Sequence, residues 1–587
     1  MTKGRITGIL SNLLQIEVND TVRQNEICFV LKGEQRLMAE VIKITGNIAF
    51  AQLFEAGSGL QAGDEVEFSG DLLEVSLGPG LLSKNFDGLQ NDLEAMPGNF
   101  INAGQRSAAL NLEDEYAFTP LSEIGAKLKA GDIIGEVPEN ALSHKIMLPF
   151  KFEGENELIE IAAPGNYKLR DTIAKVKNEK GEVFELTMVQ KWPVKWPIKT
   201  YQQKFRPSEI FQTGLRVIDT LNPIAEGGTA YIPGAFGTGK TVLQQAIAKN
   251  NRAEVVILVA CGERANEVVE IFHSFPELED LATGRKLKDK TTIVCNTSNM
   301  PVAAREASVY VGMTMAEYYR AMGYKVLLLA DSTSRWAQAL REMSNRMEEL
   351  PGTDAFPVEL PAVIANFYGR AGKVQMPDGR NGSVTFLGTV SPAGGNFKEP
   401  VTESTSKVAR CFYALSQKRA DAKRYPAIDP LLSYSRYLDY EEFQAFTEEQ
   451  IEKGWTDKVL KAKNILAKGI EARDQISILG DDSVPLDYHR DFWKSELIDF
   501  AFIQQDSFDD TDMNSSIERQ SFMLNRVLQI CDREQEFDDF SEVSSFYKKL
   551  INLFKQMNYS DFDSDDFQKF NQELDSVFST NLQNTEA

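Results

Sequence analysis

Eight residues, 234–241, read GAFGTGKT and form a complete phosphate-binding loop. Glycines let the backbone N–H groups of such a loop turn inward and form a concave nest for anions. The lysine reaches the β- and γ-phosphates of a bound nucleotide, and the final hydroxyl can bind Mg²⁺. We therefore predict that ATP or ADP, together with Mg²⁺, is held by Gly234, Ala235, Phe236, Gly237, Thr238, Gly239, Lys240, Thr241 and Val242.

The segments on either side of this loop supply the context that the motif requires. Residues 229–233 are short and apolar like a buried strand, and residues 242–249 have the pattern of a helix. A strand, a glycine-rich loop and a helix in this order place the helix N-terminus against the phosphates. The alternative is a glycine-rich turn without a ligand, which the complete motif in this context makes the weaker reading.

Acidic and basic residues follow two further strand-like segments. Asp331 ends the apolar run 326–330, and Glu263 and Arg264 follow the apolar run 255–260. Because ligands bind at the carboxyl ends of parallel strands, we expect these side chains beside the loop. Asp331 would hold Mg²⁺ directly or through water, Glu263 would polarise the attacking water, and Arg264 would contact the terminal phosphate. The alternatives are a helix-capping aspartate and a surface ion pair.

Composition excludes several other classes of function. The net charge of −23 opposes a nucleic-acid partner, because phosphate backbones require clustered lysine and arginine. Five scattered cysteines predict reduced thiols, and three separate histidines oppose a histidine-based metal site. No apolar run approaches the roughly 18 residues of a membrane span. We expect a cytoplasmic chain that meets a membrane only peripherally.

A chain of 587 residues is long enough for several domains, and its patterns change along its length. Short alternating strands predict an N-terminal β-barrel, and a β-rich insertion follows a linker that belongs to the central domain. Apolar strands then alternate with helices, which predicts a mostly parallel sheet. Long helices, such as 447–467 and 512–530, predict a C-terminal helical domain. The predicted boundaries are 1–72 for the barrel, 73–111 for the linker, 112–190 for the insertion, 191–437 for the nucleotide-binding domain and 438–587 for the helical domain.

Several longer motifs carry a resemblance to a known family. They are the loop 234–241, GERANE at 262–267, NTSNMPVAAREAS at 296–308 and ADSTSRWA at 330–337. In this order they resemble the catalytic A subunit of the V-type and A-type rotary ATPases, and the resemblance spans roughly residues 75 to 510. It implies a RecA-like P-loop NTPase core, and the insertion resembles the bulge that marks these subunits.

The resemblance also implies partners and further site residues. Three A and three B subunits form a ring around a central stalk, with peripheral stalks outside it and an ion-translocating sector in the membrane. ATP sits at the A–B interfaces, where the B subunit supplies an arginine finger. Tyr425 and Phe508 match the aromatic residues of the adenine pocket. The implied function is ATP hydrolysis or synthesis coupled to proton or sodium transport, at the inner face of the cell membrane.

Two alternatives and one departure accompany this interpretation. A type III protein-export ATPase is opposed by the insertion, and a nucleotide-binding but non-catalytic ring subunit is opposed by the intact Lys240, Glu263 and Asp331. Asn222 stands where the family pattern TGQRVIDTLFPI has phenylalanine. Such departures leave the catalytic residues untouched and bear on contacts and coupling.

Overall fold

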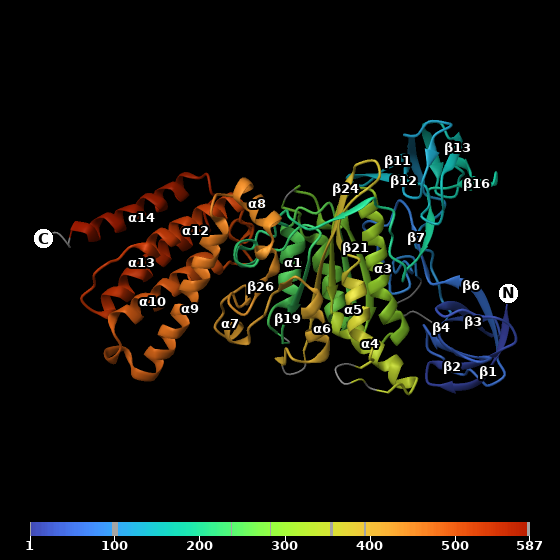
Figure 1. Cartoon of the computed structure of the whole chain (residues 1–587), viewed down its shortest axis with the longest axis horizontal. Helices are drawn as coiled ribbons and strands as arrows, with labels where there is room; N and C mark the ends of the chain where they lie inside the picture. Colours follow the sequence, from blue (N-terminus) through green and yellow to red (C-terminus); the bar gives the residue numbers. More distant parts are fainter. Residues whose placement is uncertain are drawn as a thin grey trace.

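The N-terminal strands of the computed structural model close into a barrel, as the alternating sequence predicts (Figure 1). The structure describes residues 2–96, 104–235, 237–281, 283–350, 352, 356–392 and 395–583. The barrel order is β1-β2-β5-β4-β3-β6. Every second side chain points inward, so its core is made of residues such as Ile16, Val30 and Val66. The strands are β1 (Lys3–Leu10), β2 (Leu13–Val18), β3 (Glu26–Lys32), β4 (Gln35–Thr45), β5 (Ile48–Leu53) and β6 (Glu65–Leu72).

The insertion is built from two four-stranded antiparallel sheets, which confirms the predicted β-rich character. Strand β17 (Gln190–Pro193), where the insertion ends, pairs with β7 (Glu74–Leu77), so its exit lies beside the chain that leaves the barrel. The first sheet contains β10 (Lys127–Leu128), β13 (Asn156–Ile161), β15 (Ala174–Lys177) and β16 (Val183–Leu186). The second contains β12 (Leu142–Met147), β11 (Ile133–Glu139), β9 (Glu115–Pro120) and β14 (Gly165–Lys168).

The central sheet is mostly parallel, as predicted, and its path runs β26-β25-β19-β24-β22-β20-β21-β8. Strand β8 (Asn85–Asp87) comes from the linker and joins the edge beside β21 (Thr291–Thr297). The buried strands are β19 (Thr229–Pro233), β20 (Val255–Glu263), β22 (Lys325–Asp331) and β24 (Asn381–Val390). The shorter edge strands are β18 (Gln203–Phe205), β23 (Gly372–Gln375), β25 (Cys411–Phe412) and β26 (Tyr434–Ser435).

Helices cover both faces of this sheet (Figure 1). Apolar helix α3 (Val302–Ala321) is buried along almost its whole length, because it packs against the sheet. The other helices of this region are α1 (Lys240–Asn250), α2 (Ala265–Ser274), α4 (Thr333–Arg346), α5 (Leu360–Tyr368), α6 (Pro400–Val408) and α7 (Gln417–Asp421). The boundaries at 72, 111, 190 and 437 stay a prediction.

The C-terminal helical domain lies at the opposite end of the molecule from the barrel (Figure 1). Two helices predicted as continuous are broken. Gly454, with φ +75°, separates α8 (Glu441–Gln450) from α9 (Trp455–Leu479). The Ser516 side chain caps α12 (Ile517–Asp532), after the short α11 (Asp510–Met513). The remaining elements are the 3-10 helix η6 (Asp481–Ser483), α10 (Leu486–Leu497), the π-helix η7 (Ile498–Ile503), α13 (Phe540–Asn558) and α14 (Asp565–Gln583).

A polar contact joins the helical domain to the nucleotide-binding domain at Asn222, the residue that departs from the family pattern. Asn222 is fully buried, and its Oδ1 accepts a hydrogen bond from Lys463 Nζ on α9 at 2.9 Å. Burial lowers the pKa of the Lys463 ammonium to about 8. Asn222 thus accepts a hydrogen bond from a titratable lysine at an interface within this chain.

Replacing Lys463 by methionine should stabilise the chain at neutral pH by about 2 kcal/mol. At neutral pH the buried charge of Lys463 destabilises the fold by about 3 kcal/mol, and its removal relieves this cost. Loss of the hydrogen bond to Asn222 offsets about 1 kcal/mol of that gain. Between pH 8 and about 10.5 the unfolded chain binds more protons than the native one, so wild-type stability rises with pH and the gain disappears. Thermal unfolding of Lys463→Met and wild type at pH 7.5 and 10 measures this. Lys461→Met, at an exposed neighbouring lysine, is the control. A gain that is the same at both pH values would contradict the prediction.

Two further sequence predictions concern the cysteines and membrane spans. All five cysteines are buried and none is paired in a disulfide, and their reduced state stays a prediction. None of the helices in the described part of the chain combines the length and low polarity that crossing a membrane requires.

Candidate active site

The phosphate-binding loop lies at the carboxyl end of β19 and leads into α1. Gly237 and Gly239 have φ of +82° and +87°, and a Cβ on either would meet no described atom within 4 Å. The glycines thus leave the loop open to a ligand and allow its backbone to curl around an anion. Thr238 Oγ1 donates to the Ala235 carbonyl at 2.8 Å, which stabilises the loop from within. Phe236, predicted to contact the nucleotide, lies outside the described residues, and Val242 is half-exposed on the first turn of α1.

Lys240, Thr241 and Asp331 come together where α1 meets the carboxyl ends of the neighbouring strands β19, β24 and β22. The Lys240 ammonium donates to the Gly234 carbonyl at 3.1 Å and to the Ser391 hydroxyl. Thr241 Oγ1 lies 3.5 Å from Asp331 Oδ2. A hydroxyl and a carboxylate are the oxygen ligands that Mg²⁺ prefers, and these two are close enough to share one ion or its waters. The pair therefore fits the metal that the sequence predicts.

Glu263 is the last residue of β20, the strand next to β22. Ala260 lies opposite Asp331 in this parallel pair, so both carboxylates project from the same edge of the sheet. Glu267 follows one turn later on α2 and forms a hydrogen bond with Glu263. Arg264 is exposed at the N-cap of α2. The structure therefore places Glu263 and Arg264 at the edge that carries the loop.

Burial and crowding of negative charge raise the pKa values of the acidic groups. Burial raises the pKa of Glu263 to about 8, and the charges of Asp331 and Glu267 add to this rise. Burial also raises the pKa of Asp331, against the hydrogen bond from Thr389 and the charge of Lys240. For the Lys240 ammonium, burial lowers the pKa. Such a cluster attracts cations and is typical of a catalytic site.

Tyr425 and Phe508 line one pocket of about 260 Å³. The Phe508 side chain is 96% exposed, so its ring is available to stack on a ligand. The backbone N–H of Gln505 donates to the Tyr425 carbonyl at 2.9 Å, and this bond joins the two segments. Leu415, close to Tyr425 in the chain, donates to the Pro233 carbonyl at 3.0 Å. The pocket is thereby tied to the strand that carries the phosphate-binding loop.

Four residues that the sequence analysis left without a role belong to this site. Thr389 Oγ1 donates to Asp331 Oδ1 at 2.5 Å, and Ser391 accepts from Lys240. Glu267 raises the pKa of the Glu263 carboxyl, and the charge of Arg335 lowers it. Glu267 and Arg335 stand inside the motifs at 262–267 and 330–337 that carry the family resemblance, so the signal for them was present. Thr389 lies on β24, outside those motifs, and is found only because β24 pairs with β22, the strand that ends at Asp331.

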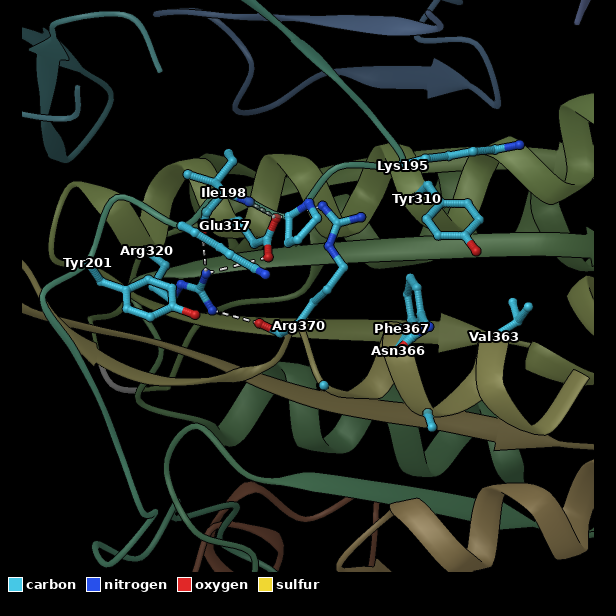
Figure 2. Close-up of a pocket in the computed structure, with 14 residues that line it drawn as sticks. Lys195, Ile198, Tyr201, Tyr310, Glu317, Arg320, Val363, Asn366, Phe367 and Arg370 are labelled. Atoms are coloured by element: carbon cyan, nitrogen blue, oxygen red, sulfur yellow. Dashed lines mark hydrogen bonds and ion pairs between the residues drawn. The ribbon is translucent and has the colours of Figure 1, made fainter. Parts of the chain in front are cut away.

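A larger cavity, of about 520 Å³, lies between α3, α5 and the chain that leaves the insertion (Figure 2). Glu317 Oε2 lies 2.6 Å from Arg370 Nη2, and Glu317 Oε1 lies 3.5 Å from Arg320 Nη2. Both arginines also donate to backbone carbonyls within residues 194–198. No described residue of 234–241 lines this cavity. The cluster therefore fastens the chain that leaves the insertion to α3 rather than forming a second phosphate site.

Family comparisons place this architecture in one class. Residues 3–70 match "ATP synthase alpha/beta family, beta-barrel domain", and residues 107–195 match "ATPsynthase alpha/beta subunit barrel-sandwich domain". Residues 214–435 match "ATP synthase alpha/beta family, nucleotide-binding domain", and residues 444–540 match "C-terminal domain of V and A type ATP synthase". The barrel, the insertion and the P-loop domain together define an alpha/beta-type subunit of the ATP synthases.

Curated relatives narrow this class further. The V-type ATP synthase alpha chain of Treponema denticola is 47% identical over 96% of this chain and 94% of its own length. That of Borrelia turicatae is 45% identical over 97% of this chain and 98% of its own length. V-type ATP synthase alpha chain 1 of Treponema pallidum is 44% identical over 98% of this chain and 96% of its own length. This chain belongs to the family of V-type ATP synthase alpha chains.

Proposed function

We propose that this chain is the catalytic alpha subunit of a V-type ATP synthase and couples ATP turnover to ion transport. The observation that carries this function is the convergence of Lys240, Thr241, Asp331 and Glu263 at one edge of the central sheet. This convergence supports a site in which one nucleotide-binding domain supplies the groups for phosphate, for the metal and for the attacking water. The match of residues 444–540 to the V- and A-type C-terminal domain favours this function over a type III protein-export ATPase.

Each predicted residue has a role in this proposal. The loop backbone and Lys240 hold the β- and γ-phosphates, and Arg264 contacts the γ-phosphate from the N-cap of α2. Thr241 binds Mg²⁺ directly, and Asp331 does so directly or through water. When bound, the ion neutralises charge that develops on the phosphate oxygens.

Glu263 and the aromatic pair complete the proposed site. Glu263 orients the attacking water and accepts its proton, which requires the ionised carboxylate. The cations of the loaded site lower the raised pKa of this carboxyl and favour that form. Tyr425 and Phe508 stack on the adenine from the two sides of their pocket.

The proposed partners follow from the family. The chain alternates with a B subunit in a ring of six, around a central stalk and held by peripheral stalks. It lies at the inner face of the cell membrane, where the ion-translocating sector is a separate set of subunits. The net charge of −23 remains the argument against a nucleic-acid partner.

Replacing Asp331 by asparagine tests the proposed metal site by binding alone. We expect the affinity for ATP in excess Mg²⁺ to fall about 10–100-fold, the loss typical when a residue that supports a metal is removed. With EDTA in place of Mg²⁺ the affinity should change little. Calorimetric titration of the full chain measures both, and Asp378→Asn, at an exposed loop aspartate, is the matched control. An equal loss with and without Mg²⁺ would exclude a metal role for Asp331.

A further inference from the structure

One wall of the proposed base pocket depends on a short loop of the helical domain. Residues 504–509 follow η7 and carry Phe508, whose side chain is almost fully exposed. Since few contacts of its own hold this ring, its position is set by the backbone of the loop. The groups that anchor that backbone therefore decide whether the two aromatic rings of the pocket face one another.

Arg216, in the nucleotide-binding domain, anchors this loop through hydrogen bonds of its side chain. Its side chain is fully buried, and Nε donates to the Phe502 carbonyl at 2.6 Å. Nη2 donates to the Gln504 carbonyl and to Asp512 Oδ1, each at 2.7 Å, and Nη1 donates to Asn558 Oδ1 at 3.0 Å. One planar guanidinium thus holds the start of the loop, the helix after it and α13.

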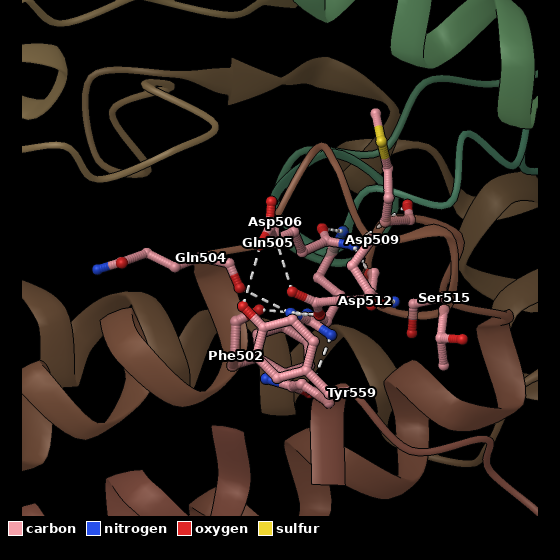
Figure 3. A network of polar contacts seen from close by, with 12 residues as sticks. Phe502, Gln504, Gln505, Asp506, Asp509, Asp512, Ser515 and Tyr559 are labelled. Atoms are coloured by element: carbon pink, nitrogen blue, oxygen red, sulfur yellow. Dashed lines mark hydrogen bonds and ion pairs between the residues drawn. The ribbon is translucent and has the colours of Figure 1, made fainter. Parts of the chain in front are cut away.

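A second set of bonds links the same arginine to the other wall of the pocket. The backbone N–H of Arg216 donates to Gln505 Oε1 at 2.7 Å, and the Gln505 backbone N–H donates to the Tyr425 carbonyl at 2.9 Å. Asp512 Oδ2 accepts from the Asp506 N–H at 2.8 Å. Figure 3 shows Gln505 and Asp512 directed into this network, whereas Gln504 points away from it.

We propose that Arg216 is a positioning residue for the nucleotide base, because it fixes the Phe508 loop relative to Tyr425. The inference rests on the proposed function, since it concerns the base pocket of that site. Arg216 is not among the residues that line the pocket, and its side chain donates to residues 502, 504, 512 and 558, none of which belongs to the phosphate-binding loop. Its effect is therefore confined to the base, and the phosphate subsite keeps its geometry.

The experiment separates base from phosphate binding with two probes, Mg-ATP and Mg-tripolyphosphate, titrated into the full chain. In Arg216→Lys the charge remains, but a lysine cannot reproduce the planar fork. We expect ATP affinity to fall about 10-fold, in the range for loss of one aromatic stacked on a base. The affinity for tripolyphosphate should be unchanged, so the ratio of the two affinities falls about 10-fold.

Arg519→Lys is the matched control, because Arg519 is also a buried arginine of the same region. It donates to the carbonyls of Thr511, Met557, Asn558 and Ser560, none of which lies in η7 or in the loop 504–509. Its replacement should lower the thermal midpoint without changing the ratio of affinities. Asp512→Asn provides a second test should Arg216→Lys fail to fold, with a fall in the ratio of about 3-fold.

Several outcomes would overturn the inference. Equal losses of ATP and tripolyphosphate affinity in Arg216→Lys would make Arg216 a purely structural residue, as would an unchanged ATP affinity. If the wild-type chain binds both probes equally well, the base pocket contributes nothing to ATP affinity, and the inference fails although the phosphate site is retained. Wild-type chain that binds neither probe would overturn the proposed function, and the positioning role with it.

Discussion

Replacing Glu263 by glutamine should lower the ATP turnover of the assembled complex by about 10²–10⁴-fold, the range for loss of a general base. Glutamine keeps the size of the side chain but cannot accept the proton of the attacking water. Glu263 ends β20 beside Asp331 and Glu267, at the edge that carries the phosphate-binding loop. Removing one negative charge from this cluster does not weaken the attraction for phosphate, so nucleotide affinity should be retained.

Steady-state turnover and nucleotide titration of the same preparation measure the two parts of this prediction. Glu270→Gln is the matched control, since Glu270 lies on α2 as well but is exposed. It should leave both quantities within about two-fold of wild type, as surface substitutions usually do. Turnover of Glu263→Gln above a tenth of wild type would remove Glu263 from the role of base. A parallel loss of nucleotide binding would instead assign it a structural role.

Assembly with the proposed B subunit should raise ATP turnover by about 10³–10⁵-fold over the isolated chain, the effect of an arginine supplied in trans. Phe508, Tyr425, Val242 and Arg264 are all exposed in the single chain, so the proposed site is open on the side of its ligand. We therefore expect a neighbouring subunit to exclude water and to bring a further cation to the phosphates. ATP binding depends on the complete loop of this chain and should need no partner.

Turnover of the chain, of the partner and of their mixture, together with the native mass of the mixture, gives the test. A six-membered complex with a large gain in turnover is the expected result. A mixture that forms the complex without the gain would refute an arginine in trans. Strong turnover by the chain alone would show a self-sufficient ATPase.

The parts of the fold that were predicted from sequence are those whose signals are local. Strand alternation in the first 70 residues predicts the barrel, and the motif at 234–241 predicts the loop between β19 and α1. Asp331 and Glu263 were found because each ends an apolar strand, and parallel strands bring their carboxyl ends together. The structure places these residues at one edge, and their catalytic roles stay a prediction.

The features that escaped prediction depend on residues far apart in the chain. Thr389 reaches Asp331 only because β24 lies beside β22, and Arg216 meets its partners in residues 502–558 across a domain interface. The sequence analysis missed the helix break at Gly454 for a different reason. A single glycine inside an amphipathic pattern is tolerated at a modest cost, so the pattern alone does not distinguish a break from a weak point.

The edge strand β8 has a consequence for the order in which the chain can fold during synthesis. Its partner β21 is made about 200 residues later, which is roughly 10–40 s at the usual 5–20 residues per second. All six barrel strands, by contrast, emerge before residue 73. The barrel can therefore close on the ribosome before the rest of the central sheet is made. Until then the β8 segment has no partner strand, and its apolar Phe86 is uncovered. A translational pause before residue 291 would prolong that exposure and should raise the demand for chaperones.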